Sequence, residues 1–380
     1  MDVFALNLRH LRAIVEISRC GSISGAATAV NLTQPAITQA LAKLESGIGQ
    51  PLFVRRADGM SPTPAAELLV SRAEAALNHI ASSRVTMAQL RALVALADAG
   101  SYAGASAATA LSQPSLHRAV GDLSLALRRE LVTRRGKGIA LTDAGRNLAR
   151  RFRLALAELT AAISELHALQ GRETGRLAIG AMPLSRARLL PAAVSAFHRL
   201  YPDVHISIVE GAFHELVEPL RDGALDLIIG AVRDPAPGPD LDQTVLFEDR
   251  PVVLARHGHP MQGSDVRRLA QYPWIVPSPG TPLRGQWERI FCEAGIAAPR
   301  VPIECGSVIT IRQILMDSDF LTLLSPDQVA VELEAGWLRR ICDAPPGLVR
   351  RIGLTTRANW RPTARQASFM ELLDIHAGGS

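Results

Sequence analysis

The apolar residues of the N-terminal part of the chain recur at steps of three and four, which is the spacing of an amphipathic helix. The first such face is made of Leu8, Leu11, Ile14, Val15 and Ile17. Gly21 is placed to end this helix, and a short helix of small residues follows from Ser24. Thr33 is then placed to cap a third helix, which carries Pro35 in its first turn, where a missing N–H costs nothing.

The third predicted helix has one apolar face and one polar face. Its core-facing side chains are expected to be Ile37, Leu41, Leu44 and Ile48, and its outward side chains Thr38, Gln39, Ala42 and Lys43. The following stretch, LFVRRADGM, predicts a short β hairpin with its turn at Asp58 and Gly59. Thr63 then caps a long helix that begins with Pro64. The pattern predicts a helix-turn-helix unit with a β wing in residues 1–82.

The same unit is written twice. Shifted by 79 residues, the sequence matches itself without a gap and gives 20 identical pairs in the 57 positions from 10 to 66. The identical pairs include Gly21/Gly100, Gln34/Gln113, Pro35/Pro114, Arg55/Arg134, Arg56/Arg135 and Thr63/Thr142. Such a match indicates a duplication, with the second copy in residues 83–146.

Positive charge is concentrated in the duplicated part. The net charge of the chain is +5, but residues 1–171 hold 19 Lys and Arg against 12 Asp and Glu, whereas the remainder holds 22 against 24. A basic half joined to a nearly neutral half is typical of a nucleic-acid-binding part with a partner domain. A merely solvated basic face gives the same count, so the charge supports DNA binding only together with the repeat.

The outward residues carry chemistry that suits DNA. In such a unit the third helix enters the major groove, where Gln34, Thr38 and Gln39 can hydrogen-bond base edges and the methyl group of Ala36 can touch thymine. The wing arginines can contact phosphates or the minor groove. The candidate DNA-binding residues of the two copies are Thr33, Gln34, Pro35, Ala36, Thr38, Gln39, Lys43, Arg55, Arg56, Gln113, Ser115, His117, Arg118, Arg134 and Arg135.

The first copy resembles the N-terminal winged helix-turn-helix of the LysR-type transcriptional regulators. The resemblance runs from Leu8 to Leu69 and rests on the GS turn, the small-residue helix, TQPAIT, the LE pair near the helix end, G-x-PLF-x-R and T-x-A. It implies that Thr33, Gln34, Pro35, Thr38 and Gln39 lie on the recognition helix and Arg55 and Arg56 on the wing. It also implies that residues 63–81 form the linker helix that normally mediates dimerisation.

The second copy departs from this pattern. It keeps SQPSLHR and TRRGKG, but Ser124 stands where the first copy has Glu45, and GQPLF is replaced by RRELV. Four basic side chains make its exposed face more basic, namely His117, Arg118, Arg128 and Arg129. Two interpretations stay open: the second copy contacts DNA with a different base preference, or it serves packing and dimerisation.

A long amphipathic helix follows the second wing from Asp143. Its apolar stripe consists of Leu148, Phe152, Leu156, Leu159, Ile163 and Leu166, and its length predicts a partner helix. By the resemblance, residues 147–172 are the linker and dimerisation helix. The first linker helix is then expected to lie between the two units.

The pattern changes after Gly171 to alternating strands and helices. Strands are predicted for RLAIGAM, VHISIVEG and DLIIGAV, with helices from Arg188 and Phe213 between them. A second run from Pro251 contains PVVLARHGHP, PWIVPSP, VPIECGS and FLTLLSP, with helices from about Leu283, Ser307 and Asp327. The strand LVRRIGLTTRANW and a closing helix from Ala364 complete the chain. Such alternation predicts parallel sheets covered on both faces.

This part resembles the LysR-type effector-binding domain, which is similar to periplasmic binding proteins. The resemblance implies two α/β lobes in residues 173–380, with lobe 1 in about 173–249 and 350–380 and lobe 2 in about 250–349, and an effector in the cleft between them. Ligands of open α/β sheets lie beyond the carboxyl ends of the strands. The candidate effector-binding residues there are Met182, Pro183, Leu184, Ser185, Gly211, Phe213, Val232, Ser278, Thr281 and Ser307. Each loop serine or threonine is also interpretable as a helix cap.

Composition and motifs exclude other classes. The chain has no run of about 18 apolar residues, and its N-terminus lacks the features of a signal peptide, so a cytoplasmic location is expected. The four cysteines share no metal-ligand spacing, although a redox-sensing pair of Cys292 and Cys305 remains an alternative to incidental thiols. No GxSxG, HExxH, Walker-type or Rossmann motif is present, so no catalytic residue, metal or cofactor is expected.

The sequence therefore predicts a multidomain protein with two tandem all-α winged helix-turn-helix units and a linker helix, followed by a two-lobed α/β periplasmic-binding-protein-like domain. Its predicted function is sequence-specific DNA-binding regulation of transcription under a small-molecule effector. The expected partners are double-stranded DNA, a small carboxylate or sugar acid, RNA polymerase and further copies of the chain in a homodimer or homotetramer. The alternatives are a solute-binding protein and a tandem helix-turn-helix used for protein contacts.

Overall fold

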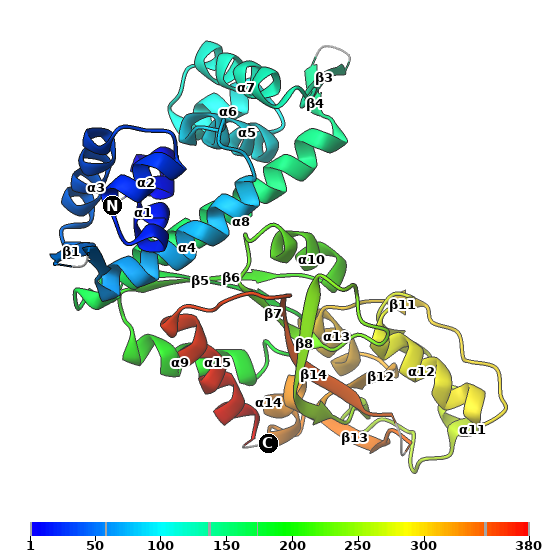
Figure 1. The fold of residues 1–380 in the computed structure, drawn as a ribbon. Coiled ribbons are helices and arrows are strands. Elements are labelled where there is room, and N and C mark those ends of the chain that lie inside the picture. The colour runs from blue at the N-terminus through cyan, green and yellow to red at the C-terminus, as the bar shows by residue number, and fades with distance from the viewer. Residues whose placement is uncertain (1, 58, 136–137, 173, 346–347, 379–380) are drawn as a thin grey trace. The chain divides into compact units, whose positions relative to one another are not determined.

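The computed structural model describes residues 2–57, 59–135, 138–172, 174–345 and 348–378. The chain divides into two compact units (Figure 1). The first comprises Met1–Gly175 with Asp222–Ala224, and the second comprises Arg176–Arg221 with Leu225–Ser380. Among the residues described, none of the helices has the length and apolar character needed to cross a membrane.

The first copy folds as its sequence predicts. A short 3-10 helix, η1 (Val3–Ala5), precedes α1 (Leu8–Cys20), α2 (Ile23–Ala29), α3 (Gln34–Ile48), the hairpin of β1 (Phe53–Arg56) and β2 (Gly59–Pro62), and α4 (Pro64–Ile80). Gly21 ends α1 at φ 64°, and the Thr33 hydroxyl accepts the Ala36 N–H at 3.4 Å. The predicted turn residue Asp58 lies outside the described residues. The predicted core side chains of α1 and α3 are buried.

The second copy repeats this order. It consists of α5 (Met87–Ala99), α6 (Tyr102–Thr109), α7 (Gln113–Leu127), β3 (Val132–Arg135), β4 (Gly138–Leu141) and the 27-residue helix α8 (Asp143–Leu169). Ser112 caps α7 as Thr33 caps α3, and Gly100 ends α5 at φ 66°, as Gly21 ends α1. Equivalent residues of the two copies therefore make equivalent local structure.

The two copies share one hydrophobic core. Helices α4 and α8 lie side by side along their length (Figure 1), and a single cluster of buried residues runs from Leu6 in the first copy to Leu166 in α8. The apolar stripe predicted for the long helix is part of this core, with Phe152, Leu159 and Leu166 almost fully buried. The partner helix that this stripe predicts is α4 of the same chain.

The first lobe of the second unit is built on a five-stranded sheet in the order β6-β5-β7-β14-β8. Its strands are β5 (Gly175–Ala181), β6 (Val204–Glu210), β7 (Leu227–Ala231), β8 (Leu241–Asp249) and β14 (Arg350–Arg357). Alternate residues of β5 face opposite cores, because Leu177 and Ile179 pack with α9 (Leu189–Leu200) and α15 (Ala364–Ala377), whereas Ala178 packs with α10 (Phe213–Arg221). The late strand β14 returns to this sheet, as the resemblance implies.

The second lobe is built on the sheet β11-β10-β12-β9-β13. Its strands are β9 (Val252–Arg256), β10 (Trp274–Val276), β11 (Ile303–Glu304), β12 (Leu321–Leu324) and β13 (Leu338–Asp343). The helical segments are α11 (Val266–Leu269), α12 (Pro282–Glu293), α13 (Val308–Met316), η2 (Pro326–Val329) and α14 (Ala330–Glu334). Trp274, Trp287 and Phe291 form the aromatic centre of the core, with the Trp287 and Phe291 rings 5.2 Å apart.

The prediction of parallel sheets was wrong in part. Strand β5 pairs parallel with β7, and β10 pairs parallel with β11 and β12, but β14 is antiparallel to β7 and β8, and β9 is antiparallel to β12 and β13. Both sheets are therefore mixed. The edge strands β8 and β13 were not predicted, because polar residues interrupt their apolar positions. The helix expected from Asp327 is a 3-10 turn followed by a single short helix.

Candidate DNA-binding surfaces and ligand cleft

The N-terminal half of α3 presents the predicted base-reading residues to solvent. Thr33, Gln34, Pro35, Thr38, Gln39 and Lys43 are exposed, and Ala36 is half-buried. The Thr38 hydroxyl donates to the Gln34 carbonyl oxygen at 3.1 Å, which holds the Thr38 methyl group in a defined orientation on this face. The face therefore offers amide groups that can donate and accept, as base edges in the major groove require.

The first wing is fixed to the helices at two points. Glu45 near the end of α3 accepts hydrogen bonds from the backbone N–H groups of Leu52, at 2.7 Å, and Phe53, at 3.4 Å. On the other side of the hairpin, the Met60 N–H donates to the Gly21 carbonyl oxygen at 2.8 Å. Arg55 and Arg56 on β1 are exposed. These contacts hold the backbone of the hairpin, and with it the strand that carries Arg55 and Arg56, against the helices of the first copy.

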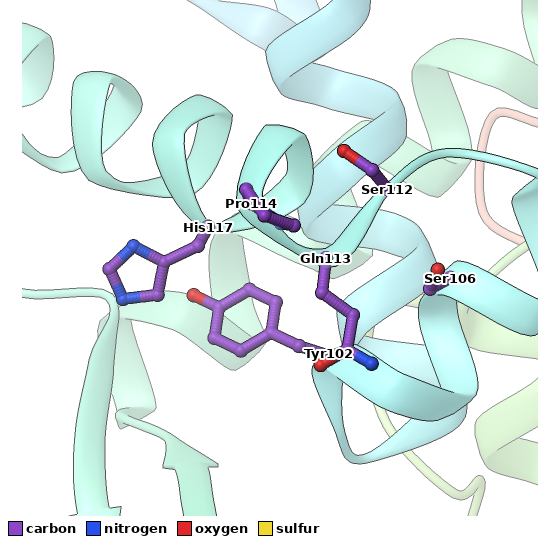
Figure 2. A pocket seen from close by; sticks show the side chains of 6 residues that line it. All are labelled: Tyr102, Ser106, Ser112, Gln113, Pro114 and His117. Atoms are coloured by element: carbon purple, nitrogen blue, oxygen red, sulfur yellow. The ribbon is translucent and has the colours of Figure 1, made fainter.

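The second recognition face differs in chemistry. Gln113, Ser115, His117 and Arg118 of α7 are exposed, and the start of α7 borders a hollow of about 580 Å³ (Figure 2). Figure 2 shows Tyr102 of α6 beside His117, with ring centroids 5.2 Å apart. Partial burial raises the pKa of Tyr102.

Tyr102 was missed by sequence reasoning. The 79-residue shift pairs it with Ile23 of the first copy, so the change from an aliphatic to a polar aromatic side chain was visible in the alignment of the two copies. The same shift pairs His117 with Thr38. The hollow therefore marks the place where the recognition surfaces of the copies have diverged.

The second wing carries Arg134 and Arg135 on β3, both exposed. Residues 136 and 137 of the TRRGKG stretch lie outside the described residues. Ser124 does not reproduce the role of Glu45, because its hydroxyl donates to the Val120 carbonyl oxygen at 3.0 Å within α7. Ser124 therefore does not provide the second wing with the side-chain tether that Glu45 provides to the first wing.

A cleft of about 570 Å³ lies within the second unit and takes residues from both of its sheets. Eight of the ten predicted effector residues line it, namely Met182, Pro183, Leu184, Gly211, Phe213, Ser278, Thr281 and Ser307. Ser185 and Val232 are not among its lining residues. Ser185 is fully buried and its hydroxyl donates to the Met182 carbonyl oxygen at 2.8 Å, while the Val232 N–H donates to the Arg351 carbonyl oxygen.

Three basic residues of the cleft were missed. Arg186, His214 and Arg233 line it, and each directly follows a residue that the sequence analysis had selected. Arg186 forms an ion pair with Glu210. The Arg233 guanidinium lies over the Phe213 ring, 4.7 Å from its centroid, and among the described residues its buried Nε has no hydrogen-bond partner. Burial lowers the pKa of Arg233.

Thr281 and Ser307 each cap a helix and also line the cleft, so both predictions made for them apply. The Thr281 hydroxyl accepts the Arg284 N–H at 3.4 Å and caps α12, and the Ser307 hydroxyl accepts the Thr310 N–H at 3.4 Å and caps α13. Because both residues also line the cleft, the amino-terminal ends of these two helices border it. The partial positive charge of a helix N-terminus favours an anion at such a position.

His259 has a structural role in the second lobe. It is buried, its Nδ1 accepts the Met261 N–H at 3.0 Å, and its Nε2 lies 3.1 Å from the Asp319 carbonyl oxygen. In the described part of the chain no three His, Cys, Asp or Glu side chains gather as metal ligands would. Cys292 in α12 and Cys305 after β11 are both free thiols.

Comparison with known proteins decides the family. Residues 170–377 match the family described as LysR substrate binding domain. The family described as bacterial regulatory helix-turn-helix protein, lysR family, matches twice, at residues 8–67 and 87–146. The chain belongs to the LysR family. It is a DNA-binding transcriptional regulator with an effector-binding domain, and the double match is consistent with the internal duplication.

Curated relatives that match over most of their length are transcriptional regulators. The HTH-type transcriptional regulator GalR of Pseudomonas putida is 33% identical over 373 residues, which cover 94% of each chain. Such coverage includes at least most of each N-terminal copy. The SDS degradation transcriptional activation protein of a Pseudomonas strain is 32% identical over 274 residues, covering 71% of this LysR-type chain and 89% of that protein.

Solved structures show the same fold. A point variant of full-length OxyR from Pseudomonas aeruginosa matches with a TM-score of 0.56 at 20% identity, covering 76% of this LysR-type chain and 97% of that one. CbnR, a LysR family transcriptional regulator, matches with a TM-score of 0.54 at 19% identity, covering 76% and 98%. These likenesses support the assignment of a helix-turn-helix part followed by two α/β lobes.

Proposed function

We propose that this LysR-type regulator responds to a small organic anion, a carboxylate on an apolar or aromatic body, bound in the cleft of the second unit. The observation that carries the proposal is Arg233, whose guanidinium is held over Phe213 and whose buried Nε has no hydrogen-bond partner in the described structure. A buried donor without a partner costs about 1–3 kcal/mol, and a carboxylate oxygen satisfies it with a charge-assisted hydrogen bond.

The surroundings of Arg233 support a negative charge. The cleft is bordered by the amino-terminal ends of α10, α12 and α13 through Phe213, Pro282 and Val308. Backbone N–H groups at these ends favour an anion. The neighbouring Arg186 is already paired with Glu210, and Arg350 is paired with the buried Asp249 at 2.8 Å. Arg233 is therefore the guanidinium that we assign to the effector.

The rest of the cleft suits an apolar body. Its lining includes Met182, Leu184, Leu283, Ile311 and Ile352 together with Phe213. Apolar walls with a few convergent polar groups are typical of small-molecule sites, and burial of the ligand body supplies most of the affinity. A sugar acid, with hydroxyl groups along its whole carbon chain, fits this lining less well than an aromatic or aliphatic acid.

On the DNA side, we propose that Gln34, Thr38 and Gln39 read base edges in the major groove and that Arg55 and Arg56 contact the backbone or the minor groove. Effector binding changes the arrangement of the lobes and thereby the position of the DNA-binding units, which alters DNA bending or contact with RNA polymerase. We further propose that the chains assemble into a homodimer or homotetramer on the operator.

A thermal-shift experiment on the full chain tests the effector proposal. Benzoate, succinate and gluconate are each compared with benzamide, which has the shape of benzoate without its charge. The expected result is that benzoate raises the unfolding temperature and benzamide does not, because saturation at 100 times Kd adds about 2.7 kcal/mol to stability.

The matched variants are Arg233→Gln and Arg199→Gln. Arg199 is an exposed residue of α9 outside the cleft, so its replacement removes the same charge without touching the site. The benzoate shift is expected to disappear in Arg233→Gln and to persist in Arg199→Gln. Equal shifts with benzoate and benzamide, or an unchanged benzoate shift in Arg233→Gln, contradict the assignment of a carboxylate to Arg233.

A further inference from the structure

Helices α4 and α8 pack in opposite directions. Arg72 of α4 donates to Glu158 at 3.0 Å and to Glu165 at 2.7 Å, and Arg151 of α8 donates to the carbonyl oxygen of His79 at 2.8 Å. Residues late in α4 therefore meet residues early in α8, as an antiparallel pair requires. These contacts join the first copy to the second.

The contacts are reciprocal under the duplication. The 79-residue shift pairs Arg72 with Arg151 and His79 with Glu158. Arg72 of the first copy contacts Glu158 of the second copy. Its equivalent in the second copy, Arg151, contacts His79 of the first copy, and His79 is the equivalent of Glu158. Only the acceptor differs, since it is the Glu158 carboxylate on one side and the His79 backbone carbonyl on the other.

A second reciprocal pair lies at the other end of the units. Arg12 of α1 donates to the carbonyl oxygens of Ser82, at 2.6 Å, and Ser83, at 3.1 Å, just before α5. Its equivalent Arg91 in α5 lies over the ring of Phe4, 4.7 Å from the centroid, just before α1. The shift pairs Phe4 with Ser83. In both sets of contacts, exchanging each residue for its equivalent in the other copy gives back a contact that the structure contains.

Reciprocity of this kind is the mark of a two-fold interface, in which residue i contacts j and j contacts i. We infer that the two winged helix-turn-helix units of one chain form a pseudo-two-fold pair through α4 and α8, so that a single chain presents both recognition helices to an operator of two non-identical half-sites. The inference deepens the DNA-binding function and rests on it. It assigns the second copy to DNA recognition as well as to packing.

The half-sites are non-identical because the recognition helices differ where they face solvent. Thr38 and Gln39 of α3 correspond to His117 and Arg118 of α7, and Lys43 corresponds to Asp122. All these side chains are exposed. Arginine prefers guanine in the major groove, whereas glutamine prefers adenine, so the two copies select different bases. Gln34 and Gln113 remain identical and provide a matched pair for testing.

The experiment starts from the duplex that the full chain selects from a random-sequence library. Hydroxyl-radical footprints of that duplex are recorded with the wild type, Gln34→Ala and Gln113→Ala, which delete the same group from exposed positions of α3 and α7. We expect an asymmetric site in which each variant loses protection over one half, at opposite ends. We also expect each variant to bind on the order of tenfold more weakly.

In a homodimer or homotetramer each chain covers its own asymmetric pair of half-sites, so the footprint repeats that pair, and Gln34→Ala and Gln113→Ala still lose protection over different halves of it. If only the first copy reads DNA, two chains share a symmetric site, Gln34→Ala weakens both halves and Gln113→Ala changes nothing, which would overturn the inference while leaving the regulator function intact. Selection of no duplex at all, even at low salt, would overturn both.

A specificity swap supplies a second readout. The triple variant His117→Thr, Arg118→Gln and Asp122→Lys gives α7 the three outward side chains that α3 carries at the equivalent positions. Repeating the selection with this variant is expected to change one half-site only and to make it resemble the other. An unchanged selected sequence contradicts base reading by α7.

Discussion

Arg72 of α4 and Glu165 of α8 form a two-point ion pair, in which Nη2 lies 2.7 Å from Oε1 and Nε lies 3.2 Å from Oε2. The Arg72 side chain is only 7% exposed. Glu158, which precedes Glu165 by about two helical turns in α8, contacts the same guanidinium. Arginine suits this place because its planar guanidinium group donates hydrogen bonds to two carboxylates at once. The pair fixes the register in which the two copies meet.

Replacement of Arg72 by Ala is expected to destabilise the first unit by about 3 kcal/mol, because it removes the cation that Glu158 and Glu165, both largely buried, share. The measurement is the free energy of unfolding in urea, followed by circular dichroism. Arg151→Ala is the matched control, since Arg151 bonds neutral carbonyl oxygens and its loss is expected to cost about 1 kcal/mol. Equal losses in the two variants contradict a special role for the ion pair.

Gly59 at the first wing turn is expected to resist substitution. Its φ is 140°, and a Cβ there meets the Gly21 carbonyl oxygen at 2.4 Å, so Gly59→Ala displaces the wing from α1. We expect a loss of about 2 kcal/mol in stability together with weaker DNA binding. Gly138→Ala is the control in the second copy, because the nearest atom to its added Cβ is 3.8 Å away. Similar losses in both variants contradict the docking of the first wing.

Arg55 is expected to act through charge. Arg55→Ala should weaken binding to the selected duplex and to random duplex alike, and should reduce the slope of log affinity against log salt by about 1. Fluorescence anisotropy across a salt series measures both quantities. Arg199→Ala, which removes one exposed charge from the effector domain, should leave the slope unchanged. An unchanged slope in Arg55→Ala places the wing away from the phosphates.

His259 predicts an acid sensitivity of the second lobe. Burial lowers the pKa of its imidazole from the ordinary 6.5, and protonation removes the lone pair with which Nδ1 accepts the Met261 N–H. The unfolded chain therefore binds a proton more readily than the folded one. The stability contributed by neutral His259 is fully present above pH 6.5 and is lost as the pH falls below it.

The measurement is the unfolding temperature between about pH 5 and pH 8 for the wild type and His259→Asn, which keeps an acceptor near the Nδ1 position but does not titrate. The wild type is expected to lose more stability than the variant toward the acid end of this range. Parallel curves for the two proteins would assign the acid sensitivity to other groups.

Local structure was predictable because it depends on short-range chemistry. Thr33, Thr63 and Thr142 cap the helices that follow them, and Gly21 ends α1, as their positions in the sequence indicate. Strands with polar residues facing the solvent were harder to find. Strand β8 was missed because only four of its nine residues are apolar and a run of polar residues follows the first of them, so the sequence resembles a loop.

The ligand cleft was predictable in place and less so in chemistry. Eight of the ten residues chosen from loops at the ends of strands line the cleft, but Ser185 turns inward and its neighbour Arg186 lines the cleft instead. A single residue of offset decides which side chain faces a cavity, and this offset depends on tertiary packing. The pairing of α4 with α8 lay beyond the sequence for a similar reason, since an apolar stripe predicts a partner helix without saying which one.

Residues 81–86 join α4 to α5, and this short connection has a consequence for how the protein works in a cell. Two separate subunits must find each other, so the fraction that is paired falls when few molecules are present. Here the second copy is tethered to the first at an effective concentration in the millimolar range. The packed pair of winged helix-turn-helix units therefore forms at any expression level, and on the inference proposed above a cell holding a handful of these molecules has as many DNA-reading pairs as it has chains.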